Sequence, residues 1–80
     1  MTEAEVEIRL KPIFSVVLDL PEDAVDESLT VESCDKWDSL QHIHLINAIE
    51  EEFGIVLEFE QQLQILSFPT AKTIVKAALG

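Results

Sequence analysis

The sequence predicts an all-α fold, a small bundle of three main helices and a short fourth, with a long loop between the first and second helices. In the segments assigned to the main helices, apolar residues recur every three or four positions, which is the spacing of one helix face. No segment is typical of a strand with a partner. Residues 19–37 have no sustained period and are rich in acidic residues, serine and threonine, which indicates a loop. We expect residues 1–80 to form a single domain.

Residues 3–18 carry the first helical stripe, formed by Val6, Leu10, Phe14 and Val17. Two features compete with a helix there. Residues 6–10 alternate as in a strand, and Pro12 removes one backbone donor. We favour the helix because the stripe continues through the proline, and we expect Pro12 to kink it or to delay its start.

Residues 38–53 give the clearest helical pattern, and Gly54 supplies its stop signal. Its expected core stripe consists of Leu45, Ile46, Ile49 and Phe53, extended towards the N-terminus by Ile43 and Leu40. The preceding loop is expected to rest on the core through Val25, Leu29, Val31 and Trp37.

The sequence of the carboxyl-terminal third predicts three elements. They are an extended linker at residues 55–57, a short third helix within 58–66 and a last helix at about 71–79. Pro69 should hold Phe68 extended, which leaves Thr70 as the N-cap of the last helix. The short helix is expected to form around Phe59, Leu63 and Leu66. The residues of the last helix that should face the core are Ala71, Ile74, Val75 and Ala78.

The net charge of −11, from 16 acidic and five basic residues, argues against binding to nucleic acid or to an anionic membrane. It favours a basic protein partner or serves solubility alone. The single cysteine, Cys34, excludes an internal disulfide. The acidic first residues do not resemble a signal peptide, and no apolar run is long enough to span a membrane. We expect a monomer in the cytoplasm.

Two capping residues stand side by side before the clearest helix. If Asp38 is the N-cap, Gln41 takes the third helical position, as in a capping box. Ser39 is then surplus to capping, and its hydroxyl is placed at a helix N-terminus, where an anion is favoured. The alternative is that Ser39 is itself the cap, or an idle surface serine.

Asp38-Ser39-Leu40 at the head of this helix is followed, fourteen residues after the serine, by Phe53-Gly54-Ile55. In an acidic chain of this length, that combination resembles the acyl carrier proteins over nearly the whole sequence. The resemblance implies one acyl carrier domain over 1–80, with 4′-phosphopantetheine esterified to Ser39. It also implies a phosphopantetheinyl transferase that uses coenzyme A and magnesium, partner enzymes that load and transfer acyl groups, and no catalysis by the carrier.

The resemblance further implies that partner enzymes read the exposed face of this helix, which should include Asp38, Leu40, Ile43, Asn47, Glu50 and Glu51. Related carriers hold short acyl chains between their helices. In this chain such a space would be lined by residues that we assign first to the core: Leu45, Ile46, Ile49, Phe53, Leu63, Ile74 and Val75.

The sequence departs from fatty-acid-synthesis carriers on both sides of the serine. Lys36 and Trp37 precede Asp38 where those carriers have a glycine, and Gln41, His42 and His44 replace acidic residues. The Trp-Asp-Ser-Leu form resembles discrete bacterial carriers of specialised pathways. The alternatives are an aminoacyl or peptidyl carrier with the same attachment chemistry, and an acidic interaction module that is never modified.

No catalytic or metal site is expected. His42 and His44 are two residues apart and therefore lie on different sides of a helix, which argues against a shared metal. Ser39 and His42 have the spacing to meet on one face, but the chain has no nucleophile elbow and no glycine-built oxyanion site.

Overall fold

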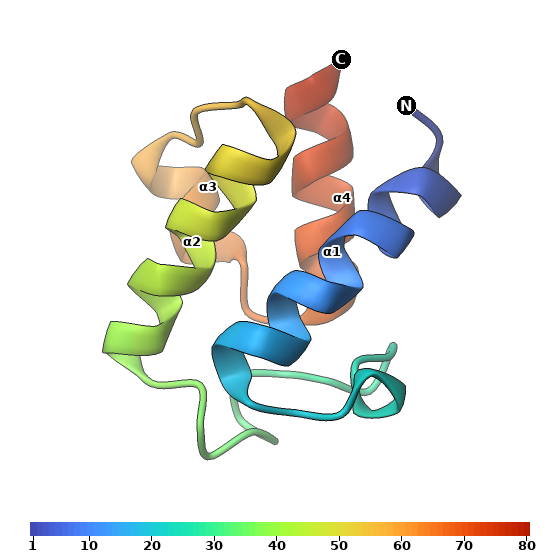
Figure 1. Ribbon diagram of the computed structural model, residues 1–80. Coiled ribbons are helices and arrows are strands. Elements are labelled where there is room, and N and C mark those ends of the chain that lie inside the picture. The colour runs from blue at the N-terminus through green and yellow to red at the C-terminus, as the bar shows by residue number, and fades with distance from the viewer.

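The structure is a computed structural model that describes residues 1–80 as helices joined by loops (Figure 1). Its elements in chain order are α1 (Glu3–Leu18), the 3₁₀ helix η1 (Glu22–Ala24), α2 (Ser39–Phe53), α3 (Phe59–Gln64) and α4 (Phe68–Leu79). The only β contact is an isolated bridge between Thr30 and Ser67. The predicted bundle of three main helices and a short fourth is therefore confirmed.

Helix α1 packs against both α2 and α4, and the short α3 contacts α4 (Figure 1). The two chain ends lie at one end of the bundle. Helix α2 begins at the opposite end, where the long loop after α1 crosses the bundle. None of the helices has the length and apolar character needed to cross a membrane.

One hydrophobic core lies between the helices, and its centre is aromatic. The ring of Phe14 in α1 meets the rings of Phe68 and Trp37 edge to face, with centroids 5.2 and 5.6 Å apart. The predicted loop anchors Val25, Leu29 and Trp37 are buried here, and Val31 is partly buried against the core. The loop is thus held to the bundle by apolar side chains along its length.

Helix α1 starts at Glu3, so the expected delay of its start by Pro12 was wrong. Thr2 and Glu5 form a capping box that fixes the start: Thr2 Oγ1 accepts from the Glu5 N–H, and the Glu5 carboxylate accepts from the Thr2 N–H. Pro12 lies inside the helix on its exposed side, where water can satisfy the carbonyl that loses its partner. In the core stripe, Leu18 is fully buried and the predicted Val17 only partly.

The core stripe of α2 is shorter than predicted. Leu45, Ile46, Ile49 and Phe53 are buried as expected, and Gly54 ends the helix in the left-handed conformation with a φ of 64°. Leu40 and Ile43, assigned to the same stripe, are 58% and 56% exposed. The first turn of α2 lies at the end of the bundle, where no other helix covers these two side chains.

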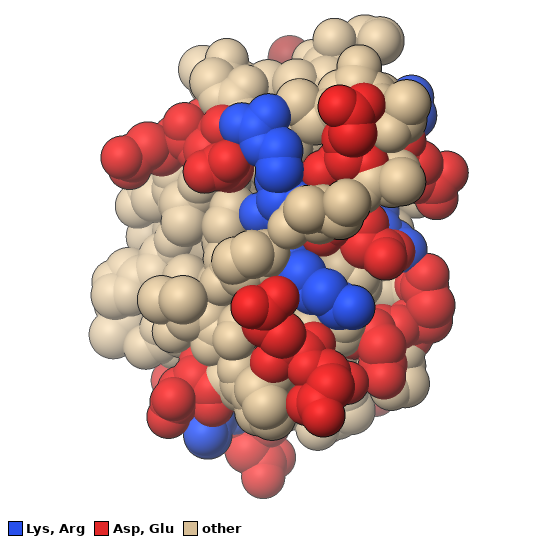
Figure 2. Space-filling model, turned by 45° about the vertical axis from the view of Figure 1, so that its right-hand side comes forward, with Lys and Arg blue, Asp and Glu red and all other residues tan.

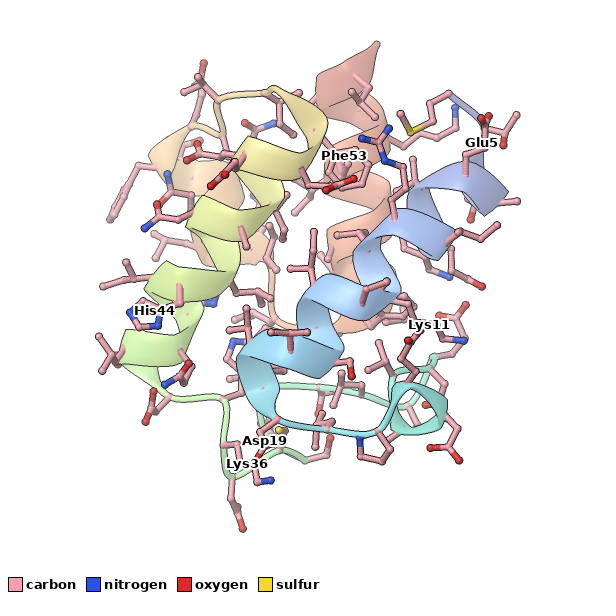
Figure 3. The ribbon with its side chains drawn as sticks, in the orientation of Figure 1. Glu5, Lys11, Asp19, Lys36, His44 and Phe53 are labelled. Atoms are coloured by element: carbon pink, nitrogen blue, oxygen red, sulfur yellow. The ribbon has the colours of Figure 1, made fainter.

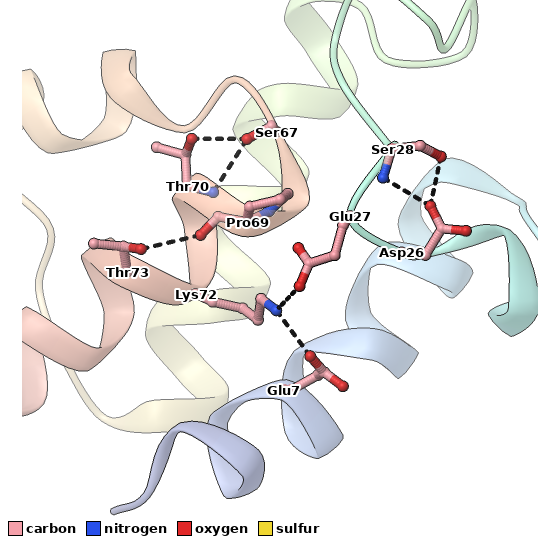
Figure 4. Close-up of polar contacts among 9 residues, drawn as sticks. All are labelled: Glu7, Asp26, Glu27, Ser28, Ser67, Pro69, Thr70, Lys72 and Thr73. Atoms are coloured by element: carbon pink, nitrogen blue, oxygen red, sulfur yellow. Dashed lines mark hydrogen bonds and ion pairs between the residues drawn. The ribbon is translucent and has the colours of Figure 1, made fainter.

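Helix α4 begins three residues earlier than predicted. Its N-cap is Ser67, not Thr70: Ser67 Oγ accepts from the Thr70 N–H at 3.1 Å, and Pro69 lies inside the first turn (Figure 4). Proline is tolerated there because the first turn has no partners for its N–H groups. Phe68 is therefore helical rather than extended, and its ring is fully buried in the core.

The short helix α3 was predicted at about the right place but with the wrong inner face. Phe59, Leu63 and Leu66 are 70%, 55% and 53% exposed. Leu57 and Ile65, on either side of the helix, are buried instead. The assignment of Leu63 to the core was wrong, because the flanking residues attach this segment to the bundle and leave the helix on the surface.

Lys72 is an unpredicted charged residue within the core face of α4. Its side chain is buried among apolar residues, and its ammonium donates to Glu7 of α1 at 2.8 Å and to Glu27 of the loop at 2.6 Å (Figure 4). These bonds lower the pKa of Glu7 and raise that of Lys72. The contact ties α1, the loop and α4 together at one point.

Candidate functional site

The start of α2 resolves which of the two adjacent candidates is the cap. Asp38 has an extended backbone, and its carboxylate accepts from the Gln41 N–H at 2.9 Å. Ser39 is the first residue of the helix. The capping box is only half formed, because the Asp38 N–H bonds to the carbonyl of Lys36 instead of to the Gln41 side chain. Asp38 alone thus caps the helix.

Ser39 has no structural task in the fold. Its side chain is exposed, and its hydroxyl makes no hydrogen bond within the protein. The backbone N–H groups of Ser39 and Leu40 also have no protein acceptor. An exposed oxygen beside two free N–H groups at the positive end of a helix suits an attached phosphate.

Trp37 holds the segment that leads into the cap. Its indole is buried, its ring packs on Phe14 of α1, and its backbone N–H donates to the carbonyl of Cys34. The ring also stacks on His42, with centroids 6.2 Å apart and an interplanar angle of 21°. The position of Asp38 and Ser39 is therefore fixed from both sides, by α2 and by the anchored indole.

His42 lies one turn into α2 and bonds through both ring nitrogens. Trp37 Nε1–H donates to His42 Nδ1 at 3.1 Å, and His42 Nε2 lies 2.8 Å from the backbone oxygen of Gln62 in α3. The imidazole therefore connects α2 with both the loop and α3. The expected separation of the two histidines is observed, since His44 is exposed on the outer side of α2 (Figure 3).

A groove of about 550 Å³ opens beside Ser39, between the loop, α2 and α3. It is lined mainly by apolar side chains, and its only charged lining residue is Asp38. The lining residues are Val31, Trp37, Asp38, Ser39, His42, Ile43, Phe59, Gln62 and Leu63. The exposed side chains of Ile43 in α2 and of Phe59 and Leu63 in α3 therefore form walls of a groove that begins at the serine.

The predicted recognition residues of α2 do not all lie in the same environment. Leu40, Ile43, Asn47 and Glu51 are exposed and follow one another at intervals of three or four residues, which places them on one side of the helix. Glu50 is half-buried, and its carboxylate accepts the backbone N–H of Leu57 at 2.8 Å. Glu50 thus holds the linker to α3.

The ring nitrogens of His42 and the arrangement of possible metal ligands bear on two other kinds of chemistry. His42 already uses both ring nitrogens, so neither is available to Ser39 as a base. No group of three or more histidine, cysteine, aspartate or glutamate side chains is arranged to hold a metal ion.

The site contains one arrangement that sequence reasoning did not find, the bridge from His42 to Trp37 and Gln62. The short spacing of Trp37 and His42 on the two sides of the cap was a weak signal for the hydrogen bond between them. No local sequence pattern indicates the bond between His42 and Gln62, because that bond depends on how α3 packs beside α2. Of the residues that would line a space for an acyl chain between the helices, all but Leu63 are core residues and at most 8% exposed. These six are Leu45, Ile46, Ile49, Phe53, Ile74 and Val75.

Fold and site together define a class of protein: a small helical bundle that presents one free serine hydroxyl at a helix N-terminus, beside an apolar groove. Residues 9–78 match the family described as the phosphopantetheine attachment site, and the chain belongs to this family of phosphopantetheine-bearing carriers. No curated protein matches the chain. The resemblance to acyl carrier proteins is confirmed, and the cofactor is covalent 4′-phosphopantetheine.

Carrier domains of this family are generally non-catalytic, and they interact with phosphopantetheinyl transferases and acyl-processing enzymes. When bound, the arm would supply a terminal thiol to which a carried group can be joined as a thioester. The residues at the start of α2 fit such a group, because an ester oxygen at Ser39 would stand in solvent beside the free N–H groups of Ser39 and Leu40.

Proposed function

We propose that this protein is an acyl carrier in which Ser39 bears the 4′-phosphopantetheine arm, and that residues 1–80 form one carrier domain. The observation that carries the proposal is the exposed, unbonded hydroxyl of Ser39 at the first position of α2, with Asp38 doing the capping. The other serines are less suited. The hydroxyls of Ser15, Ser28, Ser33 and Ser67 are all hydrogen-bonded within the protein.

Attachment requires that the Ser39 hydroxyl lose its proton as its oxygen bonds to the phosphorus of the phosphopantetheine group. The pyrophosphate bond of coenzyme A breaks in the same step, and adenosine 3′,5′-bisphosphate leaves. Within this chain both nitrogens of His42 are bonded elsewhere, and Asp38 uses Oδ1 to accept the Gln41 N–H. We assign the base and the magnesium to the transferase. The carrier contributes an accessible hydroxyl on a rigid helix end.

The cargo that we propose is an acyl group rather than an aminoacyl or peptidyl group. The groove beside Ser39 is apolar, and its one carboxylate, that of Asp38, is engaged as a helix cap. A charged ammonium would find a single carboxylate among the groove's lining residues, that of Asp38, whose Oδ1 already accepts the Gln41 N–H. An apolar acyl group would bury surface against Ile43, Phe59 and Leu63, which are more than half exposed.

The partner surface that we propose lies around Ser39, with Asp38, Leu40, Ile43, Asn47 and Glu51 as its contacts. Glu50 is a weaker member, because its carboxylate holds the Leu57 N–H. Gln41, His42 and His44 make the first turns of α2 less acidic than in fatty-acid-synthesis carriers, which supports a role in a specialised biosynthetic pathway. The cytoplasmic location and the monomeric state belong to the same proposal.

The experiment that tests the proposal is an intact-mass measurement before and after incubation with coenzyme A, magnesium and a broad-specificity phosphopantetheinyl transferase. We expect the chain to gain one phosphopantetheine unit. Ser39→Ala should gain none, whereas Ser33→Ala, which alters another exposed serine, should gain one as the unaltered chain does.

The outcomes separate the candidate functions. A gain in Ser39→Ala would show that the attachment residue is misassigned. No gain in the folded, unaltered chain would favour the unmodified interaction module. Acyl and aminoacyl carriers behave alike in this assay, and they are distinguished by offering the modified chain to an acyl-loading and an aminoacyl-loading enzyme, with transfer from the first expected.

A further inference from the structure

The hydrogen bonds around His42 specify its protonation state. The indole N–H of Trp37 is a donor only, so His42 Nδ1 must accept and cannot carry a proton. The Gln62 carbonyl is an acceptor only, so the nitrogen facing it, Nε2, must donate. The structure thus requires the neutral ring with its proton on Nε2.

This one tautomer holds two walls of the groove beside Ser39. Trp37 comes from the loop and Gln62 from α3, and both line the groove together with His42 itself. Gln62 is also tied to the linker, because its side-chain amide donates to the Leu57 carbonyl at 3.0 Å. Apart from His42, no side chain bonds both the loop and α3 at this groove.

We propose that His42 is the positioning residue of the groove beside Ser39: its neutral, Nε2-protonated ring holds the Trp37 wall and the α3 wall together, and protonation of the ring releases the Trp37 wall. That the phosphopantetheine arm uses this groove rests on the proposed function. The positioning role itself belongs to the unmodified chain.

Protonation affects the two bonds of His42 differently. A proton added to Nδ1 faces the indole N–H, so two donors oppose each other and the Trp37 bond is lost. The bond from Nε2–H to the Gln62 carbonyl persists and becomes charge-assisted. The groove should therefore loosen on the loop side only. Histidine side chains change charge between about pH 5 and 8, so this change falls within an accessible range.

Few other charged groups face His42. On α2, Asp38 lies one turn earlier and lines the same groove. On the loop, Lys36 adjoins Trp37, but its ammonium is turned to Asp19, with its nitrogen 2.8 Å from the backbone oxygen (Figure 3). On α3, Glu58 and Glu60 flank Phe59 without lining the groove. Asp38 is thus the one titratable neighbour that a test must separate from His42.

The chain carries its own reporter, because Trp37 is its only tryptophan and it has no tyrosine. The experiment is a pH titration of the full chain without the arm, followed by Trp37 fluorescence and by the single indole N–H resonance in a ¹H–¹⁵N spectrum. We expect one transition in both signals as the pH is lowered and the ring of His42 is protonated. A long-range ¹H–¹⁵N spectrum above the transition should show His42 with its proton on Nε2.

His44 provides a matched control, since it is the only other histidine and is exposed on the outer side of α2. His44→Gln should keep the transition, and Asp38→Asn, which retains a capping side chain, should keep it too. His42→Gln should abolish it, with helical circular dichroism showing that the variant is folded.

A flat signal in the unaltered chain, a transition that survives in His42→Gln, or a His42 proton on Nδ1 would each overturn the proposal. The first and third of these outcomes need no variant, so the proposal stays testable if His42→Gln fails to fold. All of these measurements use the chain without its arm. The proposed function fails separately, by the absence of a mass gain at Ser39.

Discussion

Asp38 and Ser39 divide two tasks at the start of α2, which are to cap the helix and to present a free hydroxyl. Asp38 satisfies the Gln41 N–H, and Ser39 keeps a hydroxyl that the fold does not use. The buried ring of Trp37 packs on Phe14 and attaches the segment before this helix end to the core. A single capping serine would have its oxygen engaged, so the pair explains how an exposed, unbonded hydroxyl can stand at this helix start while the helix keeps its cap.

Replacing Asp38 by alanine tests this division. Asp38→Ala should lower the free energy of unfolding by about 0.5–2 kcal/mol, because the Gln41 N–H loses its acceptor. It should also slow modification at Ser39. Asp38→Asn is the matched control, because asparagine caps as well as aspartate but lacks the charge. Urea denaturation gives the stability, and the time course of mass gain gives the rate; unchanged values for Asp38→Ala would contradict the prediction.

Gly54 carries a second residue-scale prediction. Its φ of 64° belongs to the left-handed region, and an added Cβ would meet no atom within 4 Å. The cost of Gly54→Ala should thus come from the backbone alone, at roughly 1–2 kcal/mol. Gly54→Asn should cost less, because asparagine tolerates this conformation. Thermal denaturation of the two variants measures the order, and an equal loss in both would be evidence against this account.

Helix α4 has the clearest case of an element held by one charged residue. Lys72 lies on the inner face, where it is only 6% exposed, and its two carboxylate partners come from α1 and the loop. Both partners remain partly exposed to solvent, so water screens the pairs. The contact fixes the relative position of three segments, while the apolar neighbours of Lys72 supply most of the packing.

The contribution of this contact to the free energy of unfolding is expected to fall at both acid and alkaline pH. Glu7 has a lowered pKa through its bond to Lys72, so its contribution is present above the ordinary glutamate pKa of about 4.3 and is lost as pH falls through the lowered value. Lys72 has a raised pKa through Glu27 and then Glu7. Its contribution is present below about pH 10.4 and is lost as pH rises through the raised value.

The stabilisation of the unaltered chain relative to Lys72→Met, measured as the difference between their melting temperatures, should therefore decrease at both acid and alkaline pH. Lys76→Met, which alters the exposed lysine one turn later, is the control and should give a difference that is independent of pH. Melting curves by circular dichroism across the pH range would show this. A constant difference for Lys72→Met would mean that the ion pairs add nothing.

The helices could be predicted from the sequence where an apolar stripe and a stop signal coincide, as in α2 with Phe53 and Gly54. Prediction failed where tertiary contacts decide. Local rules favoured Thr70 as a cap, but burial of Phe68 against Phe14 draws the helix start back to Ser67. Leu63 follows a helical spacing, yet α3 is attached through Leu57 and Ile65.

The candidate site was predictable in part for a similar reason. The Asp38–Gln41 cap is a local contact that spacing specifies, and it is observed. Outside the site, the sequence also held a signal that Lys72 would be buried. Lys72 lies four residues after Phe68 and three before Val75, on the inward face of α4. The partner of His42 on α3 is twenty residues away, and no local pattern encodes it.

At the scale of the whole molecule, the dominant electrostatic feature is the net charge of −11. Figure 2 shows acidic side chains across the visible face, with the few basic ones among them. Three of the five basic residues are paired with carboxylates, namely Arg9 with Glu52, Lys36 with Asp19, and Lys72. The remaining negative charges repel one another, which destabilises the compact state.

Salt should therefore stabilise this protein. Raising sodium chloride from about 0.01 to about 1 M shortens the screening length from about 30 to about 3 Å. The melting temperature should rise, because repulsion among unpaired carboxylates outweighs the screening of a few partly exposed pairs. A melting temperature that falls with added salt would indicate that the ion pairs dominate instead.

The opposite placement of the chain ends and the start of α2 has a practical consequence (Figure 1). A dye, an affinity tag or a surface linker joined to either terminus would project from one pole of the bundle, while Ser39 would face away from it. Immobilised copies should thus offer the serine to a large enzyme as readily as copies in solution, and a terminal dye should report on docking without obstructing it.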